Sequence, residues 1–186
     1  MRKSLLALSL LLLISPCLLA ASDRPIDPVN SKITIHVGKA GLFSAAGHEH
    51  EVSAPIAAGA IDDSQASHVW LRIEAAKLTV CPEKDQEAVQ STMQTGVMES
   101  AKFPEIRFES TSIRKIDNEK WTITGNLTLH GRTNSMTFDV LDKAGTYLGQ
   151  ARIKQTDFGI QPISVAGGTI KVLNEVKIDF VIAVGE

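Results

Sequence analysis

Apolar side chains recur at every second residue over much of this chain, most regularly between residues 121 and 140. A period of two places one apolar row on one face of a β-strand and leaves the residues between them on the face toward water. Two such rows joined by a short polar link that contains Gly131 predict an antiparallel hairpin. The alternating apolar residues are Trp121, Ile123, Leu127 and Leu129, followed after the polar link at residues 130–135 by Met136, Phe138 and Val140.

The same alternation is found along most of the remaining chain and predicts an all-β fold. Pro55 cannot donate to a sheet ladder, so it marks a strand start, an edge or a bulge. With eight or so antiparallel strands, closure into a barrel removes exposed edges, and a two-sheet sandwich is the alternative arrangement. Further strands are expected within residues 33–37, 52–61, 69–75, 106–116, 147–156 and 176–184.

One segment, residues 82–101, departs from the period of two. Val89, Met93 and Val97 stand four residues apart, and Pro82 suits the first turn of a helix. A helix with a single apolar stripe is expected to pack that stripe against the sheet. We therefore expect one helical segment that caps or flanks the barrel.

The first 22 residues are typical of a cleaved signal peptide. Arg2 and Lys3 precede an apolar run from residue 5 to residue 19, and small residues follow at 20–22. This pattern predicts export, with residues 23–186 forming a single domain. The mature chain contains no second apolar run long enough to cross a bilayer, so we expect a soluble protein without stable membrane insertion.

The net charge of the chain argues against nucleic acid and anionic membranes as partners. Removal of Arg2 and Lys3 from a chain with formal charge −2 leaves about −4. A mildly acidic domain is a poor candidate for binding nucleic acid or anionic membranes.

Cys81 is the one cysteine outside the signal segment, so an intramolecular disulfide is excluded and stability must come from packing.

No catalytic motif accompanies this pattern. The chain lacks a Gly-x-Ser-x-Gly, a Walker sequence and a His-Glu-x-x-His. The tripeptide at residues 157–159, Asp-Phe-Gly, has no kinase glycine loop or catalytic loop beside it, and a bulge with a buried Phe158 is the better interpretation. We assign no catalytic residue and do not expect an enzyme.

His48 and His50 form the most suggestive polar cluster. In a strand they point to one face about 6.5–7 Å apart along the chain, so both imidazoles could reach one transition metal. Glu51, His36 or His68 could supply a third ligand. The alternative is a pair of exposed histidines at a strand end. A metal-binding accessory or stress protein is therefore the second functional hypothesis.

The inward rows supply candidates for an apolar binding site. An interior of eight strands either fills with side chains or holds one small ligand. Aliphatic contacts suffice for a long chain, since each buried methylene contributes roughly 0.8 kcal/mol. The candidates are Phe108, Trp121, Ile123, Leu127, Phe138, Ile153, Phe158, Ile178 and Phe180.

Three spaced motifs, at residues 103–110, 123–131 and 156–160, resemble successive signatures of the YceI-like family. The resemblance implies an extended eight-stranded antiparallel, lipocalin-like barrel with an apolar tunnel. It further implies a bound polyisoprenoid lipid or quinone-like amphiphile and a bacterial periplasmic location. We thus expect a carrier, store or sensor of a hydrophobic small molecule that performs no chemistry.

Two positions depart from the pattern of that family. Gln155 stands where members often have an arginine, and residues 90–93 lack a His-Arg pair that many members carry. The contacts that those cations make to a polar head group are therefore not carried over. Homodimer formation is left open.

Overall fold

The computed structural model describes residues 23–40, 49–62, 68–165 and 170–185. The predicted signal peptide, residues 1–22, and His48 lie outside these ranges. Within them, no helix combines the length and the apolar character needed to span a membrane.

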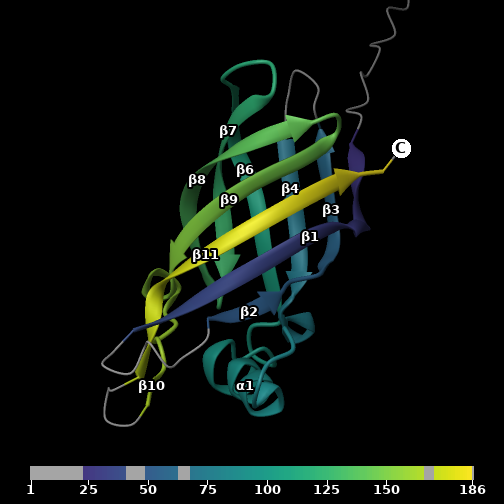
Figure 1. Cartoon of the computed structure of the whole chain (residues 1–186). Helices are drawn as coiled ribbons and strands as arrows, with labels where there is room; N and C mark the ends of the chain where they lie inside the picture. Colours follow the sequence, from purple (N-terminus) through teal and green to yellow (C-terminus); the bar gives the residue numbers. More distant parts are fainter. Residues whose placement is uncertain (1–22, 41–48, 63–67, 166–169, 186) are drawn as a thin grey trace, which may run out of the picture.

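Eight long antiparallel strands form a closed barrel (Figure 1), which confirms the predicted fold class. Each strand pairs with its neighbours in the sheet, and pairing of the last strand with the first closes the barrel. Because the eight strands form one closed sheet, the alternative of a two-sheet sandwich is wrong. The barrel strands are β1 (Arg24–Ala40), β3 (Ile56–Asp62), β4 (His68–Glu74), β6 (Glu105–Lys115), β7 (Lys120–Leu129), β8 (Arg132–Lys143), β9 (Thr146–Lys154) and β11 (Ile170–Val184).

Three short strands extend the sheet at its margins. They are β2 (His50–Ser53), β5 (Thr79–Val80) and β10 (Ser164–Val165). β2 pairs with β1 and β5, and Pro55 separates β2 from β3. The break at Pro55 agrees with its inability to donate to the ladder.

The predicted hairpin is β7–β8, but its turn is shorter than the polar link suggested. The turn consists of His130 and Gly131, which have φ of 51° and 72°. Two residues with positive φ match the twist of the flanking strands. β8 begins at Arg132, so the polar residues 132–135, predicted as a link, are part of a strand that pairs with β7. Thr128 and Thr133 illustrate this, since their hydroxyls lie 2.7 Å apart.

β1 begins earlier than the alternation predicted. A carboxylate oxygen of Asp27 accepts hydrogen bonds from the backbone N–H groups of Val29 and Asn30. The resulting local turn produces a shift in register between Asp27 and Lys32, where β1 pairs with β11. The turn thus interrupts the strand without ending it.

The helical segment is shorter than the predicted range of 82–101. α1 (Gln86–Thr92) continues into one π-helical turn, η3 (Met93–Val97), and the whole lies at one end of the barrel (Figure 1). Two glutamine side chains attach it to the chain at residues 75–80. The amide of Gln90 bonds the backbone N–H of Val80 and the carbonyl of Leu78, and Gln94 donates to the carbonyls of Ala75 and Leu78. The apolar residues Val89, Met93 and Val97 of this segment line the interior of the barrel.

The strand predicted for residues 147–156 ends two residues early. The prediction of a bulge at residues 157–159 is wrong, because a 3-10 turn is found there. β9 ends at Lys154, and a 3-10 turn, η4 (Gln155–Phe158), follows. Gly159 ends this turn with φ of 76°, a backbone conformation that favours glycine. Phe158 is buried as expected, at 3% exposure.

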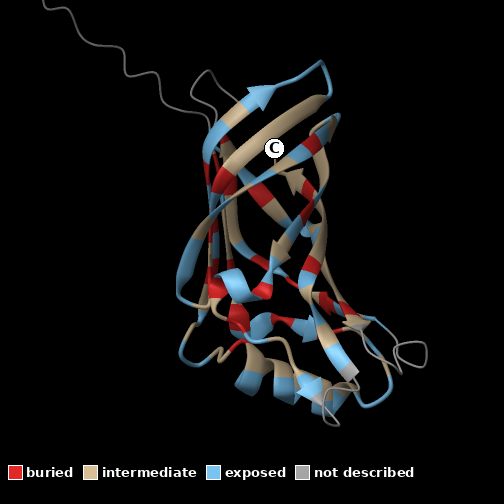
Figure 2. Cartoon of the chain, turned by 90° about the vertical axis from the view of Figure 1, so that its left-hand side faces the viewer, coloured by how far each residue is buried: buried red, intermediate tan, exposed pale blue. Residues whose placement is uncertain are grey.

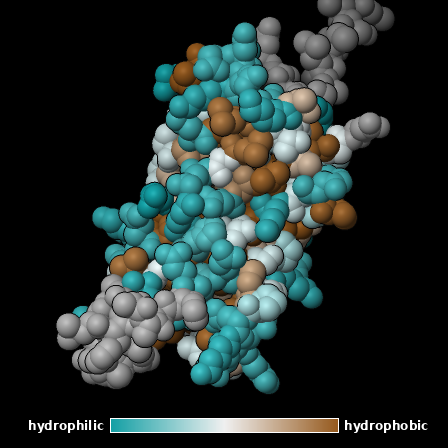
Figure 3. All heavy atoms as spheres, in the orientation of Figure 1, coloured by the Kyte–Doolittle hydropathy of each residue, from teal (hydrophilic) through white to brown (hydrophobic). Residues whose placement is uncertain are grey.

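Buried residues lie along the inner wall of the barrel and between the barrel and α1 (Figure 2). The face of the molecule seen in Figure 3 is mostly hydrophilic, with a group of hydrophobic residues in its upper part. This division follows from the alternation of the strands, whose even and odd residues point to opposite sides of the sheet. One core, inside the barrel, is therefore available for a site.

Candidate functional site

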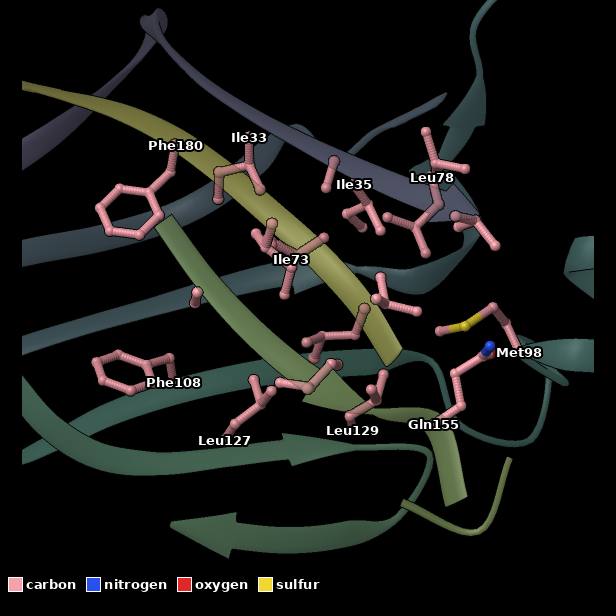
Figure 4. A pocket seen from close by; sticks show the side chains of 18 of the residues that line it. Ile33, Ile35, Ile73, Leu78, Met98, Phe108, Leu127, Leu129, Gln155 and Phe180 are labelled. Atoms are coloured by element: carbon pink, nitrogen blue, oxygen red, sulfur yellow. The ribbon is translucent and has the colours of Figure 1, made fainter. Parts of the chain in front are cut away.

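The interior of the barrel contains a cavity of about 680 Å³. All eight barrel strands and α1 contribute to its wall, and Figure 4 shows the aliphatic and aromatic side chains that project into it. A volume of this size lies within the range of roughly 300–1,000 Å³ typical of small-ligand sites. The residues predicted from alternation that line it are Phe108, Trp121, Ile123, Leu127, Phe138, Ile153, Ile178 and Phe180.

Phe158 is the one predicted lining residue that the structure places elsewhere. It packs into the hydrophobic core, whereas Gln155 and Ile160 on either side of it reach the cavity. The 3-10 turn explains the difference, since a turn of three residues replaces the period of two on which the prediction rested.

Sequence reasoning also missed part of the wall. Some missed residues, among them Ile33, Ile35, Leu71 and Ile73, lie in the inward rows of predicted strands, so the same signal could have found them. Others, such as Leu78, come from a short segment without periodicity, and no pattern in the sequence marks them. The helical stripe Val89, Met93 and Val97 also lines the cavity, in agreement with its predicted packing on the barrel.

Three phenylalanine side chains form an aromatic belt on one side of the cavity. The ring of Phe138 lies 5.5 Å from that of Phe108 and 5.4 Å from that of Phe180, centroid to centroid. The strands that lie between the three phenylalanines, β7 and β9, carry Gly125 and Gly149 next to the rings. A Cβ atom at Gly125 would lie 2.7 Å from Cε2 of Phe108, and one at Gly149 would lie 2.7 Å from Cε2 of Phe180.

The belt therefore occupies space that side chains at these two glycines would otherwise fill. Figure 4 shows Phe108 and Phe180 at one end of the row of lining side chains and Met98 and Gln155 at the other. The aromatic belt and α1 thus lie toward opposite ends of the cavity.

The α1 end of the cavity carries charged and amide groups. Lys39, His50, Lys84 and Gln155 all line it. The Nδ1 atom of His50 lies 2.6 Å from a carboxylate oxygen of Glu83. The side-chain amide of Gln155, which is 8% exposed, donates to the carbonyl of Leu173 at 2.8 Å.

A second polar group lies at the far end. Tyr147 and Asp62 line the cavity there, and a guanidinium Nη2 of Arg24 donates to the hydroxyl of Tyr147 at 3.0 Å. Pairing of Arg24 with Ile61 and of Tyr147 with Ile182 brings the ends of four strands together at this point. Asp62 is buried, at 4% exposure, whereas Arg24 and Tyr147 are half-buried.

The described residues do not bring together the ligands proposed for a metal. Among them there is no cluster of three His, Cys, Asp or Glu side chains able to hold an ion. His36 lies 3.4 Å from Glu51 and 2.9 Å from Asp179, so two of the proposed third ligands are neighbours. His68 lies 3.5 Å from Glu109, whereas His50 contacts Glu83. His48 lies outside the described residues, and the metal site at His48 and His50 stays a prediction.

Clear pKa shifts occur on the polar outer side of the barrel. A hydrogen bond from Lys120, with another from Thr122, holds the pKa of Asp139 below its ordinary value of 3.8. Hydrogen bonds from Lys177 and Gln150 likewise lower the pKa of Asp179. These charges stabilise cross-strand pairs without entering the cavity.

Comparison with known proteins points to one family. The model of the YceI-like domain matches residues 25–184. The fold is similar to that of BcnA from Burkholderia cenocepacia, with a TM-score of 0.62 and 18% identity over 87% of this chain and 99% of that chain. It is also similar to a polyisoprenoid binding domain from Saccharophagus degradans, with a TM-score of 0.59 and 14% identity over 85% of this chain and 95% of that one. No curated protein shows a significant match.

Proposed function

The chain belongs to the YceI-like family, and we propose that it binds one long apolar chain, of isoprenoid or quinone type, inside its barrel. The observation that carries this proposal is the cavity of about 680 Å³ with its almost wholly apolar wall. We further propose that the protein acts after export to the periplasm, as the predicted signal peptide indicates.

The dimensions of the cavity favour a single chain. Its wall on β11 runs from Val172 to Ile182, which are ten steps apart along the strand, and a strand tilted as in small barrels advances about 25 Å along the axis over that length. A volume of about 680 Å³ over this length leaves a mean cross-section of about 27 Å². A hydrocarbon chain whose neighbours pack about 4.5 Å away needs about 20 Å². One extended chain therefore fits along the cavity.

Burial of the chain can supply more free energy than association costs. About 20 methylenes fit into 25 Å if each advances about 1.25 Å, as expected from a C–C bond of about 1.5 Å. Burial of those methylenes contributes up to about 16 kcal/mol. Association costs about 4–15 kcal/mol in lost freedom. A long chain can therefore be held without any charged contact.

The comparisons support the same class of ligand. The Saccharophagus degradans domain, which shares the fold, is described as polyisoprenoid binding. The YceI-like family is a binding fold and is not known for catalysis. We accordingly propose sequestration, transport or sensing of the ligand, with no chemical step.

A titration with isoprenoid alcohols of increasing length tests the proposal. Delipidated protein would be mixed with 10-, 15- and 20-carbon alcohols, and complexes counted by native mass spectrometry. We expect one ligand for each chain and an affinity that rises up to about fourfold for each methylene buried. Equal affinity for all lengths, or equal binding of a two-chain phospholipid, would contradict the proposal.

A further inference from the structure

The wall of the barrel is not paired along its whole length. β8 and β9 lie wholly within the described residues, and their pairing is confined to residues 140–143 of β8 and 146–149 of β9. The hairpin that this pairing forms lies away from α1 (Figure 1). Toward α1, β8 remains paired with β7, and β9 remains paired with β11. The facing edges of residues 132–139 and 150–154 therefore form a seam without a hydrogen-bond ladder.

A hollow of about 210 Å³ lies at this seam. Continuation of the hairpin register, in which Val140 pairs with Gly149, places Met136 opposite Ile153. Among the described residues, Met136 and Ile153 are the two that line both the hollow and the cavity of the barrel. Phe158, which does not line the cavity, lines the hollow. The exposed charged residues around the hollow are Arg152, Lys154, Asp157 and Glu175.

We propose that the seam is a lateral passage by which the apolar chain enters and leaves the barrel. The side chains of Met136 and Ile153 are its gate, because they separate the hollow from the cavity. This inference rests on the proposed function and adds the route by which the ligand is exchanged.

Both ends of the seam are fixed, so it can open while the barrel stays folded. The ladder of the β8–β9 hairpin fixes the end away from α1. At the other end, the side-chain amide of Asn134 donates to the carbonyl of Asp157 in η4 at 2.9 Å. Arg132 packs over Gly159, where a Cβ atom would lie 2.7 Å from its Nε atom. Rotation of the side chains between these two attachments opens the wall and leaves the ladder intact.

The chemistry of the two gate residues suits passage of a hydrocarbon. Both side chains are half-buried. Met136 is unbranched and flexible, so it adapts to irregular gaps, whereas Ile153 is branched and stiff at χ1. Ile153 has no polar side-chain atom, and the thioether of Met136 is a weak acceptor. An apolar chain that moves between them therefore exchanges one set of apolar contacts for another.

The α1 end of the barrel is a less favourable route. Glu83, before the helix, lies 2.6 Å from His50 of β2, and Glu99, after it, lies 2.9 Å from His130 of the β7–β8 turn. Displacement of the helical segment would break these contacts and the four hydrogen bonds that its two glutamine amides make. Opening at the seam breaks none of them.

A crosslink across the seam tests the passage. Ser135→Cys and Lys154→Cys place thiols at the hollow on the two facing strands, and the continued hairpin register sets them opposite one another. Cys81→Ser removes the free thiol, which does not line the cavity. A bis-maleimide then joins β8 to β9, and the same variant before crosslinking serves as the reference for folding and binding. The probe is retinol, a fluorescent isoprenoid alcohol, followed by stopped-flow fluorescence.

We expect the crosslink to slow association and dissociation of retinol by the same factor, about tenfold or more. Equal slowing leaves Kd unchanged, as a passage requires, whereas loss of a contact acts mainly on dissociation. Leu141→Cys and Leu148→Cys, paired in the hairpin and absent from the cavity wall, are the matched control, and their crosslink should change neither rate.

The outcomes separate the passage from the proposed function. Unchanged rates after crosslinking at Ser135→Cys and Lys154→Cys would overturn the passage, and the proposed function would still stand. Failure of retinol to bind the wild type would refute the proposed function, and the passage with it.

A matched pair of truncations tests the gate. Ile153→Ala and Ile178→Ala remove the same atoms from half-buried residues of the cavity wall, but of the two only Ile153 also lines the hollow. We expect Ile153→Ala to raise the association rate constant for retinol about threefold or more, and Ile178→Ala to raise dissociation alone. Equal association rate constants for the two variants would contradict a gate at Ile153.

Discussion

Obstruction of the barrel at its midpoint should divide the cavity and limit the length of chain that binds. Ala151 is suited to this test because it lies midway between Tyr147 and Gln155 in the inward row of β9. It is 7% exposed, lines the cavity and is paired with Ile178 of β11. Ala151→Trp places an indole across the path that a long chain would follow.

The size of the effect follows from the length of cavity lost. Half of a cavity about 25 Å long holds about ten methylenes. Burial of ten methylenes is worth up to about 8 kcal/mol. If the chain regains half of that by folding back into the open part, about 4 kcal/mol remain, which corresponds to about a thousandfold loss of affinity. A ten-carbon chain, which fits into one half, should lose little.

The assay compares dissociation constants for 10-, 15- and 20-carbon alcohols in the wild type and in Ala151→Trp. Wild-type affinity should rise across the series, and affinity of the variant should stop rising near ten carbons. Gln150→Trp adds the same side chain one residue earlier, on the outer face of β9, and serves as the matched control. If Ala151→Trp binds the 20-carbon chain as the wild type does, the ligand does not lie in the barrel.

Three further predictions concern the fold around the site. Phe138→Ala removes the central ring of the aromatic belt and should lower the free energy of unfolding by about 3 kcal/mol, measured by urea titration; an unchanged midpoint would mean that the belt carries no packing energy. Gly131→Ala places a Cβ 2.7 Å from Phe103 at φ of 72° and should cost about 1–2 kcal/mol, whereas Gly96→Ala, with no atom within 4 Å, should cost nothing; similar melting temperatures for the two would refute this. Because the pKa of Asp139 is lowered in the folded state, its contribution to stability is present above its ordinary value of 3.8 and is lost as the pH falls through the lower folded value. Asp139→Asn should therefore flatten the fall in stability on acidification, and an unaltered acid limb in the denaturation profile would contradict that assignment.

Alternation of side chains was sufficient to predict the barrel strands, and eight of the nine interior residues that it named line the cavity. The rows on β7 and β8 are regular because one face of each strand lies inside the barrel and the other meets water. The prediction failed where the backbone leaves that period. Phe158 lies in a 3-10 turn, and Leu78 lies in a segment fixed by the amides of Gln90 and Gln94 from the helix. These hydrogen bonds join residues 12 and 16 positions apart, and no periodic pattern in the sequence indicates them.

The polar ends of the cavity could not be foreseen from local sequence either. Arg24 and Tyr147 are 123 residues apart and meet only because closure of the barrel brings β1 and β9 to the two sides of β11. The aromatic belt is a similar case, since its three rings come from β6, β8 and β11. The sequence identifies each phenylalanine as inward-facing, but only the register shows that Gly125 and Gly149 make room for the rings.

The most direct test of the account is native mass spectrometry of the protein purified without detergent from its natural exported compartment, followed by organic extraction. The account predicts a discrete adduct on each chain that extracts as one long apolar molecule. An adduct of metal mass that disappears with chelator, together with no binding of added isoprenoid alcohols, would contradict it and return the function to His48 and His50.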